Sequence, residues 1–359
     1  MVWNLTAIIN RYDWRRRSTD ILRSLYGHFI PGKHRRSFGE YYTPDWLAEH
    51  ICYKIISERY IKTQLNRFRN GEAVSGVLDP FCGSGTFLVH AIGRISNSKA
   101  LSEARLSERQ RVDFISSMIY GMDIHPVAVE MARANVRRLL PSADQINVYQ
   151  GDSLLISRSD SSVLSVGGEN MFLESPGGRK LIIPKSFLKT NDNIRAFVES
   201  AKDGAKFPPG LDTGLNMDES DTVKQAHYIM TDIIKEEQNG IWYWYIVNQA
   251  APILLKEKKV GRIVSNPPWV ALQEIQVATR KAEITSMAKS MGLYVGRVVA
   301  GKLDVAMLAM ARSTGLYLDG NRTGWVLPQG AMTGAGNWEK LTKLYEGRMT
   351  EMWDLGRLV

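Results

Sequence analysis

The chain has 359 residues, 44% of them hydrophobic and 23% charged, which is ordinary for a globular protein with a buried core. Its only cysteines, Cys52 and Cys82, are too few for a disulfide framework or a cysteine-ligated zinc site, so we expect no metal and a reducing, cytoplasmic location. No uninterrupted apolar run approaches the ~20 residues that a membrane span needs, and no signal-peptide pattern opens the chain, so no membrane partner is expected.

The net charge of +9 is concentrated near the N-terminus. Residues 1–70 contain 13 Lys and Arg against 6 Asp and Glu, a surplus of 7. A basic surplus suits a polyanion such as DNA, because each neutralised phosphate releases counterions. The clusters at 15–17 and 33–36 fit either phosphate contacts or a solvated surface, and the sequence leaves both open.

Two helices are predicted in this region, over residues 17–28 and 45–60, because apolar residues recur three and four positions apart. Thr43 is the expected N-cap of the second helix and Pro44 its first residue. Residues 1–70 are therefore expected to form an N-terminal helical segment that also contributes basic surface.

From residue 75 onward, strands and helices alternate. Strands are predicted at 77–78, 118–122 and 146–149, with helices at 86–95 and 126–139. Strands separated by helices pair in parallel, so the expected fold class is α/β with a doubly wound, mostly parallel, Rossmann-like sheet.

The alternation then breaks over residues 156–240, which are rich in Ser, Gly, Asp and Pro and show few helical patterns. Residues 171–175 and 179–184 predict a hairpin around a glycine turn. We interpret this stretch as an insertion between the third and fourth strands. Further elements are expected after it: a helix at 242–258, a strand at 262–265, a helix at 303–318, and strands at 325–327 and 352–355.

A glycine loop follows the first predicted strand. Glycines there let the backbone approach a ligand at the carboxyl edge of a parallel sheet, but the pattern is not the dinucleotide motif G-x-G-x-x-G. Its leading acid would repel a pyrophosphate and attract the ammonium of an amino-acid moiety, which favours S-adenosylmethionine over NAD. The loop reads Asp79-Pro80-Phe81-Cys82-Gly83-Ser84-Gly85-Thr86.

Two more acids end the next two predicted strands. Asp123 is placed to accept hydrogen bonds from both ribose hydroxyls of a nucleoside. Asp152 is placed to accept a hydrogen bond from its adenine amino group. Each acid alone could be a helix cap or a turn residue. Three acids at three consecutive strand ends favour a ligand site.

The catalytic candidate is the string Asn266-Pro267-Pro268-Trp269 after the fourth main strand. The side-chain oxygen of Asn266 and the carbonyl of Pro267 can accept hydrogen bonds from one NH2, which frees its lone pair for attack on a methyl group. The prolines fix φ and remove competing donors. Trp269 can stack on a flipped base, although the string could also be a turn with its tryptophan in the core.

With these motifs together, the chain resembles the N6-adenine-specific DNA methyltransferases whose cofactor loop precedes the catalytic loop (the gamma-type motif order). Besides the two loops and Asp123 and Asp152, the segment 39–44 matches the part of that family that lies before the first strand and covers the cofactor. The resemblance implies further cofactor contacts by Tyr42, Thr43, Pro44, Ile124 and Ser153.

The resemblance also implies a function and a domain arrangement. We expect methyl transfer from S-adenosylmethionine to the N6 amine of a flipped adenine in DNA, in a restriction-modification or phage-defence system, with a specificity subunit or domain as a further partner. Residues 71–359 would be the catalytic domain, with a truncated C-terminus and no recognition domain. Trp269 also fits N4-cytosine enzymes, and protein glutamine-N5 methylation or a non-catalytic DNA-binding subunit stay open.

Overall fold

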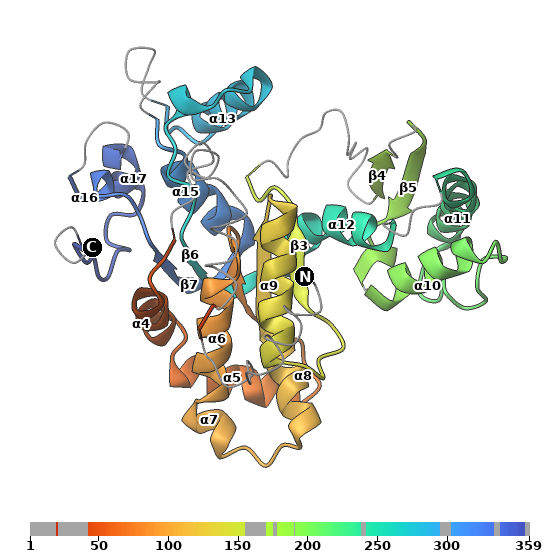
Figure 1. Cartoon of the computed structure of the whole chain (residues 1–359), viewed down its shortest axis with the longest axis horizontal. Coiled ribbons are helices and arrows are strands. Elements are labelled where there is room, and N and C mark those ends of the chain that lie inside the picture. The colour runs from red at the N-terminus through yellow and green to blue at the C-terminus, as the bar shows by residue number, and fades with distance from the viewer. Residues whose placement is uncertain are drawn as a thin grey trace, which may run out of the picture. The chain divides into compact units, whose positions relative to one another are not determined.

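The computed structural model describes residues 19–20, 42–154, 170–174, 178–189, 191–237, 242–294, 303–333 and 338–355 (Figure 1). The chain divides into two compact units. One consists of Met1–Val148 with Lys259–Val359, and the other of Tyr149–Lys258. The second unit is longer at both ends than the insertion expected at 156–240, and the domain boundaries at 70 and 71 stay predictions.

The first unit is built around a five-stranded sheet. Its order is β3-β2-β1-β6-β7, β1 is parallel to β2 and β6, and β6 is parallel to β7. This is the mostly parallel, Rossmann-like sheet expected from the sequence. The strands are β1 (Val77–Asp79), β2 (Ile119–Asp123), β3 (Asn147–Gln150), β6 (Val260–Ser265) and β7 (Leu318–Trp325).

The strand order reverses at β1. The chain adds β2 and β3 on one side of β1, and later adds β6 and β7 on the other. In open α/β sheets, ligands bind outside the carboxyl ends of the strands at such a switch point. The end of β1 and the end of β6 are therefore the places to look for a site.

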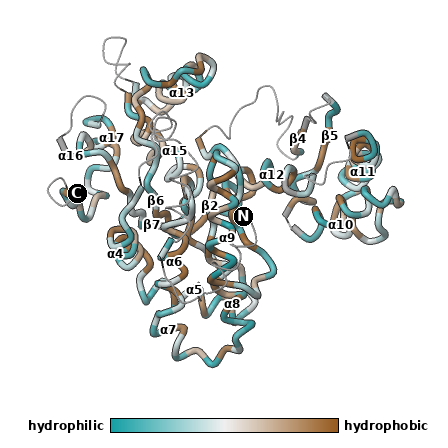
Figure 2. The backbone as a smooth tube through the Cα atoms, viewed as in Figure 1, coloured by the Kyte–Doolittle hydropathy of each residue, from teal (hydrophilic) through white to brown (hydrophobic). Residues whose placement is uncertain are grey.

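Helices cover both faces of the sheet. On one face, α6 (Thr86–Ser96) packs between α4 (Asp45–Ile55) and α9 (Pro126–Leu139) (Figure 1). Helix α15 (Val305–Tyr317) connects β6 to β7 and packs on β7. Crossovers between parallel strands are right-handed, and the crossover from β6 to β7 moves along the sheet in the opposite direction to the crossover from β1 to β2. Helix α15 therefore lies on the opposite face of the sheet from α6. Hydrophobic and hydrophilic residues alternate along α9, as expected for a helix with one buried side (Figure 2).

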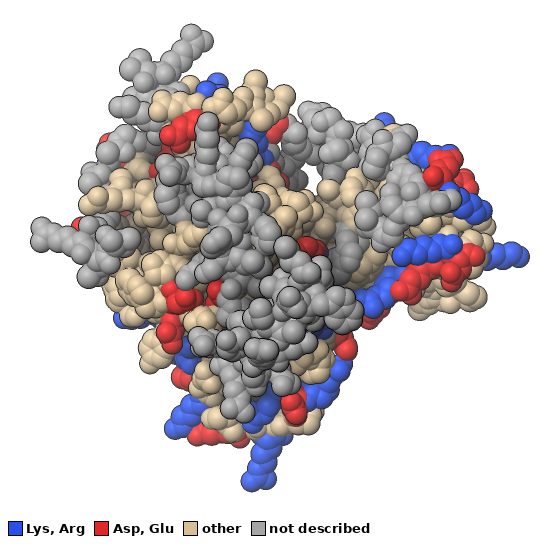
Figure 3. Space-filling view, viewed as in Figure 1, with Lys and Arg blue, Asp and Glu red and all other residues tan. Residues whose placement is uncertain are grey.

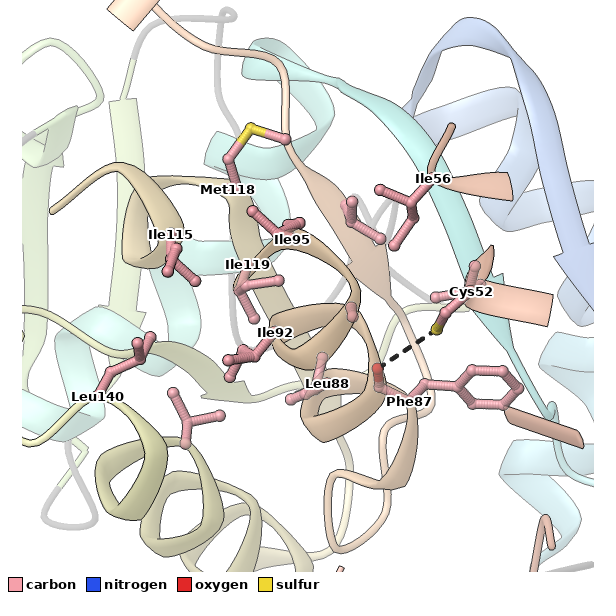
Figure 4. Close-up of a cluster of buried hydrophobic side chains, with 14 of the residues drawn as sticks. Cys52, Ile56, Phe87, Leu88, Ile92, Ile95, Ile115, Met118, Ile119 and Leu140 are labelled. Atoms are coloured by element: carbon pink, nitrogen blue, oxygen red, sulfur yellow. Dashed lines mark hydrogen bonds between the residues drawn. The ribbon is translucent and has the colours of Figure 1, made fainter. Parts of the chain in front are cut away.

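The hydrophobic core lies around α6. Leu88, Ile92 and Ile95 of this helix pack in one cluster with Ile119 from β2 (Figure 4). The thiol of Cys52 on α4 points at the carbonyl oxygen of Phe87, 3.7 Å away. Burial, with Asp79 nearby, raises the pKa of this thiol, so Cys52 is a packing residue rather than a nucleophile.

The other α-helices among the described residues of the first unit are α5 (Glu58–Arg69), α7 (Lys99–Ser102), α8 (Glu108–Met118), α13 (Ala278–Ser290), α16 (Gly330–Thr333) and α17 (Trp338–Leu344). Ser107 begins α8 with a capping box to Gln110. No helix in the described ranges is long and apolar enough to cross a bilayer.

The described residues of the second unit form a hairpin and three α-helices. The predicted hairpin is confirmed as β4 (Asn170–Glu174) antiparallel to β5 (Lys180–Pro184). A 3-10 turn, η2 (Phe187–Lys189), leads to the helices, and the predicted helix at 242–258 is confirmed. The helices are α10 (Asn191–Lys202), α11 (Met217–Glu237) and α12 (Trp242–Lys258).

The expectation of few helices over residues 156–240 was wrong, because α10 and α11 both lie there. The apolar signal was present in α11: Val223, Met230 and Ile233 are buried at helical spacing on one side of an otherwise polar segment. That side packs on β5 and α10.

Two N-terminal predictions need correction, and a third lies almost entirely outside the described residues. Of the helix expected at 17–28, only Thr19 and Asp20 are described, and neither is helical. The expected capping was wrong: Pro44, not Thr43, is the N-cap of α4, and the helix begins at Asp45, the first residue of the expected range. The helix expected at 45–60 is two helices, because Ser57 caps a new one by accepting a hydrogen bond from the N–H of Tyr60.

Two strand predictions near the C-terminus were also wrong. The strand expected at 325–327 is β7, which begins at Leu318 and ends at Trp325. Residues 352–355 form no strand. Trp353 instead lies against His50 of α4, with ring centroids 4.1 Å apart, and its Nε1 donates to Glu351.

Gly121 in β2 provides a test of this packing. A Cβ added there would lie 2.7 Å from Leu88 and 3.3 Å from the sulfur of Cys82. We expect Gly121→Ala to lower the free energy of unfolding by about 1–3 kcal/mol, because the core under the glycine loop must shift. Urea unfolding monitored by circular dichroism measures this change.

Gly93→Ala on α6 is the matched control, since a Cβ there meets nothing within 4 Å. Alanine favours a helix over glycine by up to ~1 kcal/mol, so this variant should be at least as stable as the parent. Equal stability of both variants would contradict the packing described for β2.

Candidate functional site

The ends of β1 and β6 meet at the switch point of the sheet. Leu78 pairs with Ile263 in the parallel register, so Asp79 and Ser265 finish their strands side by side. The hydroxyl of Ser265 donates to Oδ1 of Asp79 over 2.5 Å. Asp79, the first residue of the glycine loop, is thus hydrogen-bonded to Ser265, the residue that precedes Asn266.

The glycine loop is held closely against the sheet. The N–H of Phe81 donates to Oδ1 of Asp79 over 3.1 Å, and the N–H of Cys82 donates to the carbonyl of Met122 over 2.9 Å. Gly85 caps α6 in the left-handed region, with φ of 97°, a conformation that favours glycine. Of the loop after Asp79, only Phe81 and Gly83 are partly exposed, whereas Pro80, Cys82, Ser84, Gly85 and Thr86 are buried.

Asp123 joins this loop from the end of β2. Its Oδ2 accepts the N–H of Gly83 over 2.9 Å, and its Oδ1 accepts the N–H of His125 over 2.8 Å. A carboxylate has about four acceptor positions, so both oxygens keep acceptor capacity for a ligand. Asp123 is half-buried, and the neighbouring Ile124 is 53% exposed, which leaves an apolar side chain open beside the acid.

Both acids are in surroundings that disfavour their charge. Burial raises the pKa of Asp79 to about 7, although the hydrogen bonds from Ser265 and Phe81 act in the opposite direction. Burial also raises the pKa of Asp123, against its bonds from His125 and Gly83. Asp79 is only 1% exposed, so it would act on a ligand from beneath the loop.

These features fit S-adenosylmethionine, which carries an ammonium and a sulfonium. No cation of the described residues pairs with Asp79, and a cationic ligand would relieve the electrostatic cost of both acids. A Cβ built on Gly83 would meet nothing within 4 Å, so the loop is open on that side. Methyltransferase domains generally use this cofactor, and the residues present are compatible with it.

The catalytic candidate loop is anchored on two sides. The N–H of Val326, just after β7, donates to the carbonyl of Ser265 over 3.0 Å, and Nε1 of Trp269 lies 3.4 Å from the carbonyl oxygen of Val326. Beyond the loop, the N–H of Val305 donates to the carbonyl of Val270 over 3.0 Å. Asn266 is half-buried with its Oδ1 inside, Pro267 is buried, and Pro268 and Trp269 are half-buried.

The N-terminal candidates lie at the start of α4. Tyr42 is 39% exposed and Thr43 is buried, while the carbonyl of Pro44 accepts the first helical N–H groups. In the first turn, Asp45 lies 2.9 Å from Nε2 of His90 on α6. This contact ties α4 to the helix that follows the glycine loop, and the cofactor contacts of 42–44 stay a prediction.

Asp152 and Ser153 lie just beyond β3, at the start of the second unit. Oδ1 of Asp152 accepts the N–H of Leu154 over 3.0 Å, as in a turn, and Asp152 is half-buried while Ser153 is buried. Their role as contacts to the adenine ring stays a prediction.

Sequence reasoning missed two side chains that organise the site. Ser265 could have been noticed because it directly precedes Asn266. Asp20 had no local signal: its carboxylate accepts hydrogen bonds from Ser84 and Thr86, 64 and 66 positions later in the chain.

The raised pKa of Asp79 makes a prediction about stability. The folded protein holds a proton on Asp79 that the unfolded chain, with a pKa near 3.8, releases, so this group lowers stability as the pH rises from about 4 to 7. We expect Asp79→Asn to raise the unfolding free energy by roughly 1–3 kcal/mol at pH 8 and to have little effect at pH 4. Thermal melts from pH 4 to 8 measure the difference.

The exposed Asp218→Asn is the control, because it removes the same charge at the surface. If Asp79→Asn raised the unfolding free energy equally at every pH, or by the same amount as the control, the electrostatic description of this site would be contradicted.

Comparison with known proteins agrees with this geometry. Residues 66–167 match the family described as RMKL-like, methyltransferase domain, a range that includes β1, the glycine loop, Asp123 and Asp152. The adenine-specific methyltransferase PglX of Streptomyces coelicolor is 28% identical over 146 residues. That similarity covers 36% of this chain and 11% of the relative, so the chain spans only a small part of the relative's length.

The Rossmann-like sheet, the match of residues 66–167 to a methyltransferase domain and the similarity to PglX agree with the methyltransferase resemblance expected from the motifs, while adenine as the acceptor stays a prediction.

Proposed function

We propose that this chain transfers a methyl group from S-adenosylmethionine to the exocyclic N6 amine of an adenine in DNA. The observation that carries the proposal is the hydrogen bond from Ser265 to Asp79. It supports a single site in which the cofactor loop and the string Asn266-Pro267-Pro268-Trp269 act together. Both loops follow strands that flank the switch point of the sheet.

Asn266 and Pro267 would activate the amine. An aromatic NH2 is a poor nucleophile because its lone pair is delocalised into the ring. Hydrogen bonds from its two N–H groups to Oδ1 of Asn266 and to the carbonyl of Pro267 would hold the nitrogen and favour the state in which its lone pair is available. S-adenosylmethionine, when bound, supplies the electrophilic methyl group.

The rigidity of this loop supports that role. Two prolines restrict the backbone, and the contacts of Val326 with Ser265 and Trp269 fix its start and end. Acceptors that are already in place need no reorganisation during the reaction. Asp79, Gly83 and Asp123 would hold the cofactor on the β1 and β2 side, with Ile124 against its adenine.

Trp269 would hold the target base. Its ring is half-buried, and the bond from Nε1 to Val326 orients it. A base inside a duplex cannot reach such a loop, so the nucleotide must be flipped out, and stacking on an aromatic ring offers ~1–3 kcal/mol. Tryptophan at this position also suits N4 of cytosine, which is the second candidate acceptor.

DNA would be the main partner. The basic clusters at 15–17 and 33–36 lie outside the described residues, and on the face in Figure 3 basic and acidic side chains are interspersed. In the proposed arrangement, residues 1–70 cover the cofactor and add basic surface, and residues 71–359 form the catalytic domain. We also propose a restriction-modification or phage-defence role, with a specificity subunit or domain selecting the DNA sequence.

Radiolabelled S-adenosylmethionine and DNA of mixed sequence test the proposed reaction. We expect label in the DNA, recovered after nuclease digestion as N6-methyladenine. Label recovered as N4-methylcytosine would show that the acceptor is cytosine, the second candidate, and not adenine. Label only on a protein substrate would reject DNA, and cofactor binding without transfer to any substrate would indicate a non-catalytic subunit.

Two substitutions should separate the roles within the site. Asn266→Ala is expected to lower kcat at least 100-fold and to change the Kd for S-adenosylmethionine only a few-fold, because Asn266 faces the amine. Asp79→Ala should do the reverse and mainly weaken cofactor binding. Isothermal titration calorimetry gives the Kd, and label incorporation gives the rate.

The exposed Asn66→Ala on α5 is the control for removal of an asparagine and should behave like the parent. Loss of cofactor binding in Asn266→Ala, with folding intact by circular dichroism, would show that this role assignment is wrong.

A further inference from the structure

Asp20 is a buried acid bonded to the cofactor loop from a distant part of the chain. It is 5% exposed. Its Oδ2 accepts the hydroxyl of Ser84 and, over 2.9 Å, the hydroxyl of Thr86; its Oδ1 accepts the amide of Asn135 over 2.7 Å. One carboxylate therefore receives three side-chain donors from two separate elements, α9 and the loop that begins α6.

These contacts clamp the loop at its tightest point. Ser84 and Thr86 lie on either side of Gly85, the residue with φ of 97°. A Cβ on Gly85 would lie 3.1 Å from the Cα of Ala132, so α9 presses on the loop there. The amide of Asn135, which is fully buried, also donates to the carbonyl of Ser84 over 2.9 Å. Asp20 and α9 thus hold the turn together.

The electrostatic setting suits a carboxylate at this position. Asp20 contacts Thr86, the first residue of α6, and a helix N-terminus carries partial positive charge. Arg138 of α9 donates to the carbonyl of Thr19 over 2.9 Å and interacts electrostatically with Asp20. The carboxylate of Asp20 thus accepts three hydrogen bonds from buried side chains and lies beside the start of α6.

We propose that Asp20 is a positioning residue of the cofactor site, an inference that rests on the proposed function. Because Asp20 accepts the hydroxyls of Ser84 and Thr86, these two side chains shape the loop rather than reach the cofactor. The cofactor then meets the loop at Phe81 and Gly83, its two partly exposed members. Gly83 in turn donates to Asp123, so the clamp at Asp20 also sets the distance between the loop and that acid.

Asp20→Asn and Asp20→Ala test this role. Loss of a charged acceptor for three donors should raise both the Kd and the KM for S-adenosylmethionine, by about 10- to 100-fold in Asp20→Ala and less in Asp20→Asn. The kcat at saturating cofactor and the KM for DNA should stay within about twofold, because Asp20 touches none of the residues assigned to the amine. Calorimetry gives the Kd without any dependence on turnover.

Hydrogen exchange provides a second readout in the absence of cofactor. The amides of residues 83–90 should exchange faster in Asp20→Asn than in the parent, whereas those of β6 should not change. Asp144→Asn is the matched control, since Asp144 is an exposed aspartate away from this loop. It should leave the Kd and the exchange rates as they are.

The outcomes are distinguishable. If the parent protein binds no cofactor, both the proposed function and this inference are overturned. If the parent binds cofactor and a correctly folded Asp20→Asn binds it equally well, the inference alone is overturned. Should Asp20→Ala fail to fold, Asn135→Asp places a second carboxylate against Asp20 and is expected to weaken cofactor binding through the same loop, while unchanged binding would overturn the inference.

Discussion

The hydrogen bond between Ser265 and Asp79 is the contact on which the site depends. The two residues are 186 positions apart, and the sheet alone brings them together, because the pairing of β1 with β6 sets where each strand ends. The second unit, Tyr149–Lys258, separates β2 from β6 along the chain, yet β1 pairs with β6 in register. Methyl transfer needs a cofactor site and an acceptor site a few ångströms apart, and adjacent parallel strands provide such a distance without any long-range adjustment of loops.

Each strand-end loop is fixed by its neighbour. The glycine loop bonds to the end of β2 through Cys82 and Gly83, and the catalytic candidate loop bonds to the residue after β7 through Ser265 and Trp269. The edge of the sheet is therefore a chain of backbone and side-chain bonds rather than a set of independent loops. Catalysis by positioning requires this arrangement, because acceptors that move with the substrate gain little over water.

The parts of the fold with a regular local pattern could be predicted from the sequence. The helix at 126–139 and the acids that end β1 and β2 follow from periodicity and from glycine and acid placement. The division of 45–60 into two helices was missed because Ser57 acts as a cap only through a bond to the Tyr60 N–H. The strand expected at 352–355 was wrong because Trp353 gains a side-chain contact with His50 instead of a strand partner. Asp20 was beyond sequence reasoning, since its meaning depends on partners on the glycine loop and α9 that only the fold brings near.

The three acids near the glycine loop have different roles. Asp20 receives three donors and supports the loop, whereas burial raises the pKa of both Asp79 and Asp123 in the absence of a ligand. In the proposed function, a cationic cofactor lowers both pKa values, so at neutral pH its binding displaces the proton from the fraction of Asp79 that is still protonated. Methyl transfer removes the sulfonium charge and leaves a neutral thioether. The ammonium assigned to Asp79 and the ribose hydroxyls assigned to Asp123 stay on the product, so only the part of the electrostatic stabilisation that comes from the sulfonium is lost, and that loss favours product release.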